Sequence, residues 1–495
     1  MLCPPWPKNP SVYEIPCWPW LAELSRRHGR AVTLADLPAV ELDRLASLGF
    51  DGIWLMGVWE RSPTGARIAR EVPELQLGYR HALRDVTPAD VVGSPYCIHR
   101  YVVDARLGGP AGLALARQEL ARRGLRLLLD FVPNHLAVDH PWVAEHPERF
   151  VQGTPGAQRR DPSSWFSLPG GRILAHGRDP YFPAWTDVLQ LDAFHPGVRE
   201  EAARTLREIA DQCDGVRCDM AMLLLDRVFG TTWSGFVGDH LEREYWIEAI
   251  ESVRSYREDF LFIAEAYWDL EYELQQLGFD YCYDKRLYDR LRSGWVAGVA
   301  AHLAGDLQFQ QRLVRFVENH DEERAARQWG PGPSRAAAVA ALTLPGARLL
   351  HHGQLEGCQV RVPVQLGRAT PEEPDLALAG FYTRLLRELA DPVWHEGRWR
   401  LHPVRQDGDG GAGPAPLAWS WELGEARRLV VVNLTGARCT GRVELGWPEL
   451  AAASPPPVDV LAGSAASPAA AVGSLPGLSC TLQPWQPLIL RLPPA

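Results

Sequence analysis

The chain has 495 residues, of which 46% are hydrophobic and 23% are charged, an ordinary composition for a soluble globular protein. This length exceeds what one compact core supports, so we expect a large domain with additions. The net charge of −10 disfavours nucleic acid and anionic membrane surfaces as partners and suits a neutral small molecule.

The nine cysteines are scattered and include no C-x-x-C pair, which disfavours a zinc site and a disulfide framework. Reduced thiols in the cytoplasm explain them most simply. The first residues, MLCPPWPKNP, hold no apolar run long enough for a signal peptide, and no stretch reaches the ~18 apolar residues of a membrane span. We therefore expect a cytoplasmic protein that has no membrane partner.

Eight short apolar runs have the composition of buried parallel strands. Segments with apolar residues at helical spacing separate them, for example Pro110–Arg123 and Val198–Gln212. This alternation predicts an α/β fold, a (β/α)8 TIM barrel. The predicted strands are Ser11–Ile15, Gly52–Met56, Arg126–Val132, Gly215–Met220, Phe260–Ala266, Phe279–Asp284, Val314–His320 and Ala347–His352.

Two intervals are too long to be simple connections between barrel elements. One runs from residue 136 to 190, after the third predicted strand, and the other from Gly57 to Ile98, after the second. We expect both to form an ordered rim over the pocket, because they are rich in aromatic residues. These residues are Trp59, Trp142, Trp165, Phe166, Tyr181, Phe182 and Trp185.

The character of the chain changes after about residue 395. Short alternating runs such as Leu417–Glu422 and Arg428–Asn433 are separated by Gly and Pro clusters, which predicts an antiparallel β-sandwich. Ala451–Leu475 is rich in Ala, Ser and Pro, and part of it is expected to form a mobile surface loop. The predicted organisation is a barrel in two parts, 1–135 and 191–394, a small inserted domain B at 136–190, and a C-terminal β-sandwich domain at 395–495.

Four of the predicted strands end in acidic residues or histidines. They are RLLLDFVPNH (Arg126–His135), GVRCDM (Gly215–Met220), FLFIAEA (Phe260–Ala266) and VRFVENHD (Val314–Asp321). A carboxylate at the carboxyl end of a barrel strand is typical of a catalytic residue, because the loops there converge on one pocket.

These motifs resemble those of the α-amylase superfamily of glycoside hydrolases. They match its Asp-x-x-x-Asn-His, Gly-x-Arg-x-Asp, strand-terminal Glu and Asn-His-Asp patterns in order. The resemblance implies a retaining α-glycosidase with a small domain inserted after the third strand and a C-terminal β-domain. The matching residues are Asp130, Asn134 and His135; Gly215, Arg217 and Asp219; Glu265; and Asn319, His320 and Asp321.

The resemblance also implies a role for each matching carboxylate. Cleaving a glycosidic bond requires one group that protonates the leaving oxygen and another that meets positive charge at the anomeric carbon. Asp219 corresponds to the nucleophile, Glu265 to the general acid/base, and Asp321 to a third carboxylate that grips the sugar hydroxyls. Arg217 shares a strand face with Asp219 and should keep it ionised, whereas the apolar neighbours of Glu265 should raise its pKa.

The other matching residues are expected to bind the substrate or to support the carboxylates. His135, His320 and Arg217 correspond to residues that contact the sugar. Tyr96 corresponds to an aromatic ring that stacks on the sugar, with core filling as the alternative. Asp130 and Asn319 are expected to support their neighbours, Asp130 through an ion pair with Arg217.

Two positions just after the expected nucleophile depart from the family pattern, as does Arg100, where the family often has Asp. Many members acting on long glucans carry Lys-His where this chain has Met222 and Leu223, which weakens the expectation of calcium and of the usual acceptor contact. Asn134 corresponds to a calcium ligand in many amylases, and capping a turn is the alternative. Met56, Met220 and Met222 fall near strand ends, where they either fill gaps or wall an acceptor site. The predicted chemistry requires no cofactor.

Three functions fit these observations. The first is hydrolysis of α-glucosidic bonds in maltooligosaccharides or other short α-glucosides. The second is transfer or isomerisation on the same fold, with a sugar acceptor in place of water. The third is a non-catalytic carbohydrate-binding protein, which the presence of Asp219, Glu265 and Asp321 disfavours. Each of the three requires a small carbohydrate partner.

Overall fold

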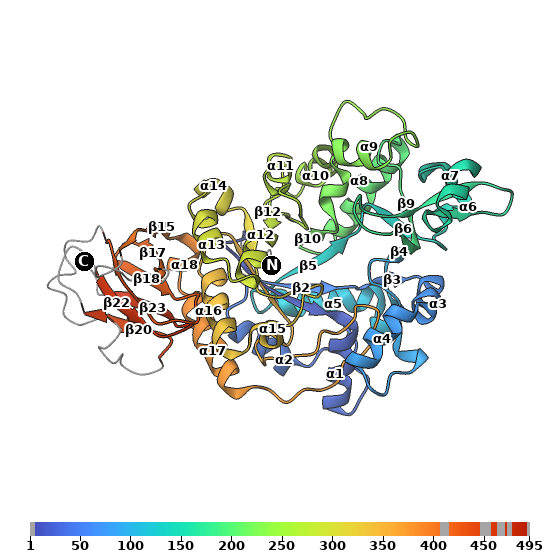
Figure 1. Cartoon of the computed structure of the whole chain (residues 1–495). Coiled ribbons are helices and arrows are strands. Elements are labelled where there is room, and N and C mark those ends of the chain that lie inside the picture. Colours follow the sequence, from blue (N-terminus) through green and yellow to red (C-terminus); the bar gives the residue numbers. More distant parts are fainter. Residues whose placement is uncertain (1–4, 406–414, 446–456, 463–470, 473–477, 493–495) are drawn as a thin grey trace.

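A computed structural model describes residues 5–405, 415–445, 457–462, 471–472 and 478–492 (Figure 1). Eight parallel strands close a barrel in the order β1-β14-β13-β12-β11-β10-β5-β2, which confirms the predicted (β/α)8 fold. Their bounds are β1 Ser11–Pro16, β2 Gly52–Met56, β5 Arg126–Phe131, β10 Gly215–Cys218, β11 Leu261–Ala264, β12 Tyr281–Tyr283, β13 Leu313–Arg315 and β14 Ala347–His351.

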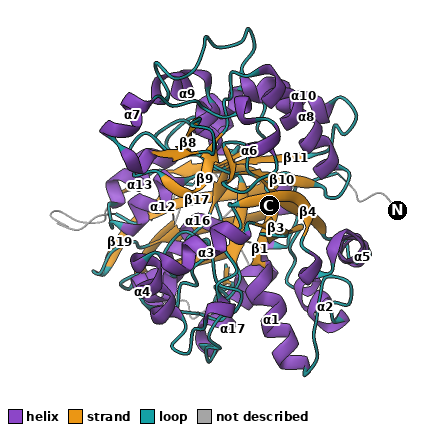
Figure 2. Cartoon of the chain, turned by 90° about the vertical axis from the view of Figure 1, so that its right-hand side faces the viewer, coloured by secondary structure: helices purple, strands orange, loops and turns teal. Residues whose placement is uncertain are grey.

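Helices surround the barrel and cover the outer face of its sheet (Figure 2). The amphipathic segments predicted at Pro110–Arg123 and Val198–Gln212 form α5 and α8. The helices between and after the barrel strands are α1 Cys17–His28, α2 Ala39–Ser47, α5 Gly109–Ala121, α8 Pro196–Ala210, α9 Asp226–Thr232, α10 Tyr245–Arg254, α11 Glu271–Gln276, α12 Lys285–Arg292, α13 Val296–Leu303, α14 Leu307–Gln310, α15 Ala325–Trp329, α16 Pro331–Leu342, α17 Leu376–Leu389 and α18 Val393–Glu396.

The interval after β2 is more regular than the sequence indicated. A two-stranded ribbon, β3 (Trp59–Arg61) and β4 (Ile98–Val103), brackets helices α3 (Pro63–Glu71) and α4 (Pro73–Ala82). Trp59, expected at the rim, is instead 1% exposed, because its indole N–H donates to the carbonyl of Asp130 at the end of β5.

The interval after β5 forms a small antiparallel sheet with strand order β6-β9-β8-β7. Of its aromatic residues, Trp165 is buried, whereas Tyr181 and Phe182 are exposed at 69% and 66%. The division into domains at 136–190 and 395–495 stays a prediction. The elements are β6 His135–Ala137, α6 Trp142–Glu145, α7 Pro155–Arg160, β7 Trp165–Ser167, β8 Ile173–Gly177 and β9 Trp185–Gln190.

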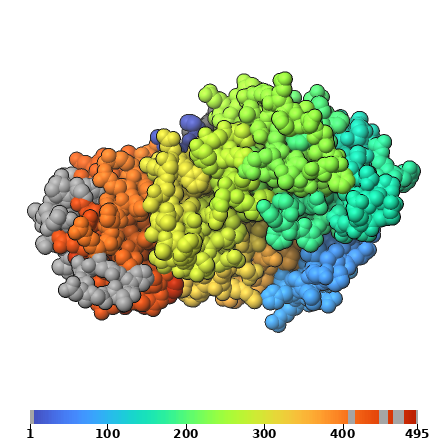
Figure 3. Space-filling model, turned by 45° about the horizontal axis from the view of Figure 1, so that its top comes forward, coloured from blue at the N-terminus to red at the C-terminus, as the bar shows by residue number. Residues whose placement is uncertain are grey.

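Two antiparallel sheets follow α18 and lie at the opposite end of the molecule from β6–β9 (Figure 3). Trp419 and Trp421 donate their indole N–H groups to the carbonyl of Thr343, just after α16, and so fix the sheets to the barrel. The predicted loop Ala451–Leu475 lies mostly outside the described residues. The strands are β15 Arg398–His402, β16 Val404–Arg405, β17 Leu417–Leu423, β18 Ala426–Val432, β19 Cys439–Val443, β20 Val458–Asp459, β21 Ala471–Val472, β22 Leu478–Leu482 and β23 Pro487–Leu492.

Among the described residues, no helix is both long and apolar enough to cross a membrane.

A buried ion pair joins α17 to the C-terminal sheets, and its loss should destabilise the protein. The carboxylate of Glu388 contacts the guanidinium of Arg428, and their side chains are 3% and 4% exposed. Glu388→Ala removes one of the two carboxylates that pair with Arg428 and also the partner of Arg491, and should lower the free energy of unfolding by about 3 kcal/mol. Chemical denaturation followed by circular dichroism measures this change.

The matched control is Glu71→Ala, because Glu71 pairs with Arg67 on the surface, where their side chains are 65% and 61% exposed. This variant should lose about 0–1 kcal/mol. Equal losses in the two variants would contradict the role assigned to Glu388.

Candidate active site

Arg217 on β10 holds two of the predicted catalytic carboxylates at once. Its Nη1 lies 2.6 Å from Oδ1 of Asp219, and its Nη2 lies 2.8 Å from Oε2 of Glu265. Asp130 on β5 is the third acidic neighbour, with Oδ1 3.8 Å from Nη1. All four residues are at most 4% exposed. The structure therefore brings three of the four strand-end motifs together around one guanidinium.

The alternation of side chains along the strands produces this convergence. Residues two apart on a strand share a face. Leu128 on β5 and Ile263 on β11 belong to one apolar cluster, to which Val12, Trp54 and Leu349 also contribute from other barrel strands. Asp130 and Glu265 follow Leu128 and Ile263 by two positions, so they lie directly above this apolar layer.

Glu265 has hydrogen-bond donors at both carboxyl oxygens. The backbone N–H of Met220 donates to Oε2 at 2.6 Å, and the hydroxyl of Tyr267 donates to Oε1 at 2.7 Å. Met220 has φ 44°, a left-handed conformation that is rare for a non-glycine residue and typical of functional sites. Burial, reinforced by the charge of Asp219, raises the pKa of Glu265 to about 7 against the opposing effect of Arg217.

The other two carboxylates around Arg217 also resist ionisation. Burial raises the pKa of Asp219, although Arg217 opposes the shift. Burial likewise raises the pKa of Asp130 to about 6, again against Arg217. The backbone N–H of Gly57 donates to Oδ2 of Asp130 at 3.1 Å and fixes this side chain next to the guanidinium. This geometry fits the supporting role predicted for Asp130.

His320 joins the fourth motif to the barrel interior. Its Nε2 lies 2.6 Å from the hydroxyl of Tyr96 and 3.0 Å from Oδ2 of Asp321, and its Nδ1 contacts Glu14 on β1. Burial disfavours a charged imidazole, but Asp321 and Glu14 hold the pKa of His320 well above its ordinary value. The amide oxygen of Asn319 accepts hydrogen bonds from the backbone N–H groups of Asp321 and Glu322 and fixes their turn.

Asp321 differs from the other carboxylates in its exposure. Its side chain is 43% exposed, whereas those of Asp219 and Glu265 are 6% and 4% exposed. Partial desolvation of its carboxyl group opposes ionisation, but His320 and Arg217 lower its pKa on balance. Asp321 is therefore an ionised group at the open side of the site.

His135 and Asn134 lie at the junction between β5 and the β6–β9 sheet. Burial lowers the pKa of His135 to about 4, so its imidazole is neutral at pH 7. The side-chain N–H group of Gln190 donates to the amide oxygen of Asn134 at 2.9 Å and to its backbone carbonyl at 2.8 Å. The same group donates to the carbonyl of Leu191 at 3.2 Å.

This arrangement does not fit a calcium ion at Asn134. Calcium is bound by six to eight oxygen ligands, and here the oxygens of Asn134 face a hydrogen-bond donor. Within the described parts of the chain, no cluster of three or more His, Cys, Asp or Glu residues has metal-binding geometry. The two oxygens of Asn134 are therefore already used within the chain.

Three functional contacts were not anticipated from the sequence. Glu14 joins His320 to His351 of β14, whose Nδ1 lies 3.1 Å from it. Tyr267 donates a hydrogen bond to Glu265, and Gln190 donates hydrogen bonds to Asn134. Glu14 could have been found by alternation, since it follows the interior residue Val12 by two positions on β1. The contacts of Tyr267 and Gln190 join loops whose paths the sequence does not define.

The methionines differ in their surroundings. Met222 is fully buried and fills space in the core, whereas Met56 is 2% exposed and lines a cavity. Met220 is partly buried and packs against the core. This agrees with the gap-filling alternative for Met222 and leaves both alternatives open for Met56.

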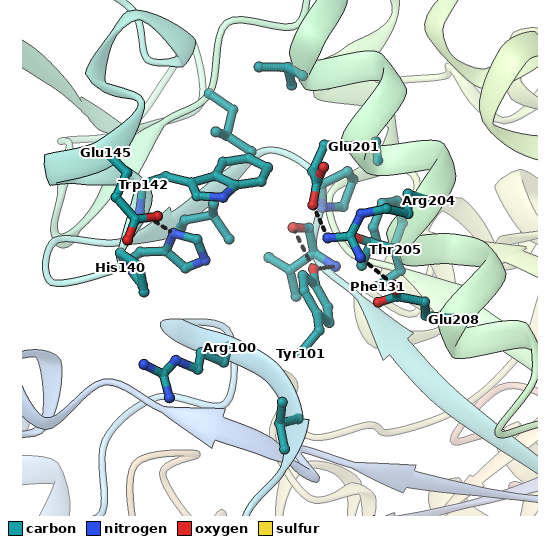
Figure 4. A pocket seen from close by; sticks show the side chains of 18 of the residues that line it. Arg100, Tyr101, Phe131, His140, Trp142, Glu145, Glu201, Arg204, Thr205 and Glu208 are labelled. Atoms are coloured by element: carbon teal, nitrogen blue, oxygen red, sulfur yellow. Dashed lines mark hydrogen bonds and ion pairs between the residues drawn. The ribbon is translucent and has the colours of Figure 1, made fainter.

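Two cavities of substantial volume occur in the described structure. One of about 290 Å³ lies outside the barrel between α6 and α8 (Figure 4), and its lining includes none of the predicted site residues. The other, of about 560 Å³, is lined by His320, Met56 and residues of α1. The second cavity therefore borders the site, whereas the first is separate from it.

A (β/α)8 barrel with carboxylates gathered at the carboxyl ends of its strands is the architecture of many glycosidases. The model of the alpha-amylase catalytic domain matches residues 39–287. The chain therefore belongs to the alpha-amylase family, and the resemblance seen in the four motifs is confirmed.

Curated relatives carry several activities in their names. The chain is 26% identical over 359 residues to alpha-amylase MalA of Haloarcula japonica, which covers 71% of the chain and 44% of that protein. It is 26% identical over 450 residues to alpha-1,4-glucan:maltose-1-phosphate maltosyltransferase 2 of Streptomyces coelicolor, covering 86% of the chain and 59% of that protein. The chain thus spans about half the length of the curated relatives it matches.

Solved structures share the fold over the whole chain. The maltogenic alpha-amylase AmyB of Thermotoga neapolitana gives a TM-score of 0.69 at 18% identity, covering 99% of both chains. An alpha-amylase from Lactobacillus plantarum gives 0.67 at 18% identity, covering 98% of this chain and 99% of that one. At these identities the likeness concerns the fold alone.

The hydrogen bonds from Gln190 to Asn134 can be tested through the stability of the protein. Gln190→Leu removes a donor that three buried carbonyl groups share, of which the backbone carbonyl of Asn134 keeps the N–H of Leu191, and should lower the free energy of unfolding by about 2 kcal/mol. Chelation by EDTA should leave the Tm of the unmodified protein unchanged. Thermal and chemical unfolding measure both effects.

The control variant is Gln76→Leu, because Gln76 donates to the carbonyl of Arg70 at an exposed position. Its free energy of unfolding should change by no more than about 0.5 kcal/mol. A rise in Tm when calcium is added to the unmodified protein would contradict the conclusion that Gln190, and not calcium, binds the oxygens of Asn134.

Proposed function

We propose that the protein is a retaining α-glycoside hydrolase that cleaves α-glucosidic bonds of maltooligosaccharides or other short α-glucosides. The observation that carries this proposal is the shared guanidinium of Arg217, which contacts Asp219 and Glu265 through its two Nη atoms. Sharing one guanidinium supports a separation of about 5–5.5 Å between the carboxyl groups, the spacing of retaining enzymes.

In the proposed reaction, Glu265 gives its proton to the departing glycosidic oxygen while Asp219 attacks the anomeric carbon. The covalent glycosyl-enzyme is then hydrolysed by a water molecule whose proton returns to Glu265. The raised pKa of Glu265, about 7, keeps a proton available at neutral pH. Arg217 stabilises the ionised form of Asp219 through its contact of 2.6 Å.

Residues at the open side of the cluster would hold the sugar. Asp321 is exposed and ionised, so it can accept hydrogen bonds from sugar hydroxyls. Tyr96, His320 and His135 are the proposed sugar-binding rings, and Tyr96 is already fixed by its hydrogen bond of 2.6 Å to His320. The reaction uses only these side chains and water, so the proposal includes no cofactor.

A transferase reaction is the second candidate. It is favoured by the match to a maltosyltransferase, which extends over 86% of this chain. Both reactions pass through the same glycosyl-enzyme, and the acceptor in the second step decides between them. We propose in addition that the substrate is a small cytoplasmic carbohydrate.

The test is incubation with maltose to maltoheptaose, isomaltose, trehalose and sucrose, followed by product chromatography. Hydrolysis should release glucose or maltose, and Asp219→Asn should abolish this release because it removes the nucleophile. Glu265→Gln should lower the rate by about 10²–10⁴-fold, as expected for loss of a general acid. Longer or rearranged sugars would establish transfer. Turnover by either variant at the rate of the unmodified protein would refute the role proposed for that residue.

A second prediction concerns the pH dependence of kcat/KM. The alkaline limb should fall near pH 7, where Glu265 loses its proton. Tyr267 donates to the carboxylate and favours its ionised form, so Tyr267→Phe should raise the pKa of Glu265. The limb should then move to higher pH by about one unit, because a hydrogen bond to a charged group contributes about 1.5 kcal/mol.

Tyr79→Phe serves as the control, since Tyr79 is fully buried in α4 and its hydroxyl has no hydrogen-bond partner in the described structure. This variant should leave the alkaline limb in place. An unmoved limb in Tyr267→Phe would refute the proposed action of Tyr267 on Glu265.

A further inference from the structure

The 560 Å³ cavity beside the catalytic cluster has an inner end and two opposite walls. His320 and Met56 lie at its inner end, and residues of α1 form one wall. The segment 358–374 forms the opposite wall and is attached to the ribbon region by hydrogen bonds. The backbone N–H of Val92 donates to the carbonyl of Gln365 at 2.9 Å, and Arg368 pairs with Asp90 at 2.6 Å.

The lining of this cavity is basic, although the protein as a whole carries a net charge of −10. Three glutamates line it, and each is already engaged. Glu23 lies 3.2 Å from His352, Glu356 lies 3.5 Å from Arg44, and Glu372 accepts a backbone N–H at 2.8 Å. The arginines that line it are Arg26, Arg27, Arg44, Arg61, Arg324 and Arg368.

Most of the buried or half-buried arginines have a carboxylate partner. Arg27 lies 2.7 Å from Glu41, and Arg324 lies 2.6 Å from Glu318. Nearly all basic residues of this chain are arginine, so an arginine in the lining is not informative by itself. An anion-binding site is indicated by an arginine in the lining that has no carboxylate partner.

Arg61 is such a cation. It is 5% exposed, and no carboxylate of the described residues lies within ion-pair distance of it. Nη1 makes both of its hydrogen bonds, to the carbonyls of Gly93 at 2.6 Å and Val364 at 2.9 Å. Its Nε is buried without a partner. Nη1 therefore helps to attach the segment 358–374, and the guanidinium carbon lies 5.4 Å from the ring of Trp18, which carries no charge to balance it.

Burying a charge without a counter-charge is costly. Burial lowers the pKa of Arg61 to about 10, so the side chain remains protonated at neutral pH. The planar guanidinium matches the geometry of a phosphate, to which it donates two parallel hydrogen bonds. A basic cleft also concentrates anions.

We propose that this cavity is a phosphate-binding site next to the catalytic cluster, with Arg61 as its central cation and Arg26 at its mouth. Because His320 borders both the cavity and the cluster, the phosphate would belong to a phosphorylated sugar whose ring reaches the catalytic carboxylates. Inorganic phosphate shares the same chemistry and is the other source. Binding at this site does not require that the protein hydrolyse glycosides.

Calorimetric titration of the Asp219→Asn protein tests the site without turnover, and thermal shift of the same protein supplements it. The ligands are inorganic phosphate, glucose 1-phosphate, glucose 6-phosphate and maltose, with sodium chloride at matched ionic strength. A sugar phosphate should bind tighter than inorganic phosphate and raise the Tm. Equal affinity would reassign the source to inorganic phosphate, and no binding by any phosphate would refute the site.

Variants of the same protein locate the binding. Arg61→Gln keeps a donor for one backbone carbonyl but removes the charge, and should weaken phosphate binding by about tenfold or more. Arg26→Gln, at an exposed position, should weaken it by a few fold and serves if Arg61→Gln does not fold. Arg100→Gln is the control, because Arg100 is exposed and lines the separate cavity. Unchanged affinity in both Arg61→Gln and Arg26→Gln would overturn the proposal.

The outcome can be separated from that of the proposed hydrolysis. Phosphate binding without release of sugar from any glucoside would support the site and refute the hydrolase. Hydrolysis of neutral glucosides without phosphate binding would refute the site alone.

Discussion

The site depends on one buried cation that serves three carboxyl groups. Arg217 is 1% exposed and is surrounded by Asp130, Asp219 and Glu265. One positive charge cannot balance three negative charges in a medium where electrostatic interactions are strong. At least one of the acids therefore holds a proton near neutral pH, and burial raises the pKa of each of them. A stored proton is what cleavage of a glycosidic bond requires.

Aromatic and apolar side chains cover the inner side of this cluster. The rings of Trp54, Tyr96 and Tyr283 lie 5.4, 5.0 and 5.8 Å from the guanidinium carbon of Arg217. A layer of apolar side chains from several strands fills the space below them. The same alternation that buries this layer places the carboxylates above it, so the core and the site result from one pattern.

The amino-acid sequence predicts the barrel and the identities of the clustered residues better than the contacts among them. Gly52–Met56 forms a strand with the predicted bounds, because apolar residues fill it throughout. The prediction for Val314–His320 is too long, since β13 ends at Arg315 and the chain then turns to present Asn319 and Asp321. The hydrogen bond of Tyr267 to Glu265 depends on a loop path, which no spacing in the sequence reveals.

Asn134 and Arg61 are both buried polar groups, but only Asn134 finds all the partners it needs within the chain. The oxygens of Asn134 find a donor within the chain, since Gln190 reaches them from β9. No ligand is then needed where the family resemblance implied calcium. The guanidinium of Arg61 finds two carbonyls for one of its nitrogens and no counter-charge for the whole group. Since an unpaired buried charge is far more costly than a paired amide, the balance at Arg61 favours an anion from outside the chain. The same physical rule thus disfavours a ligand at Asn134 and supports the anion proposed at Arg61.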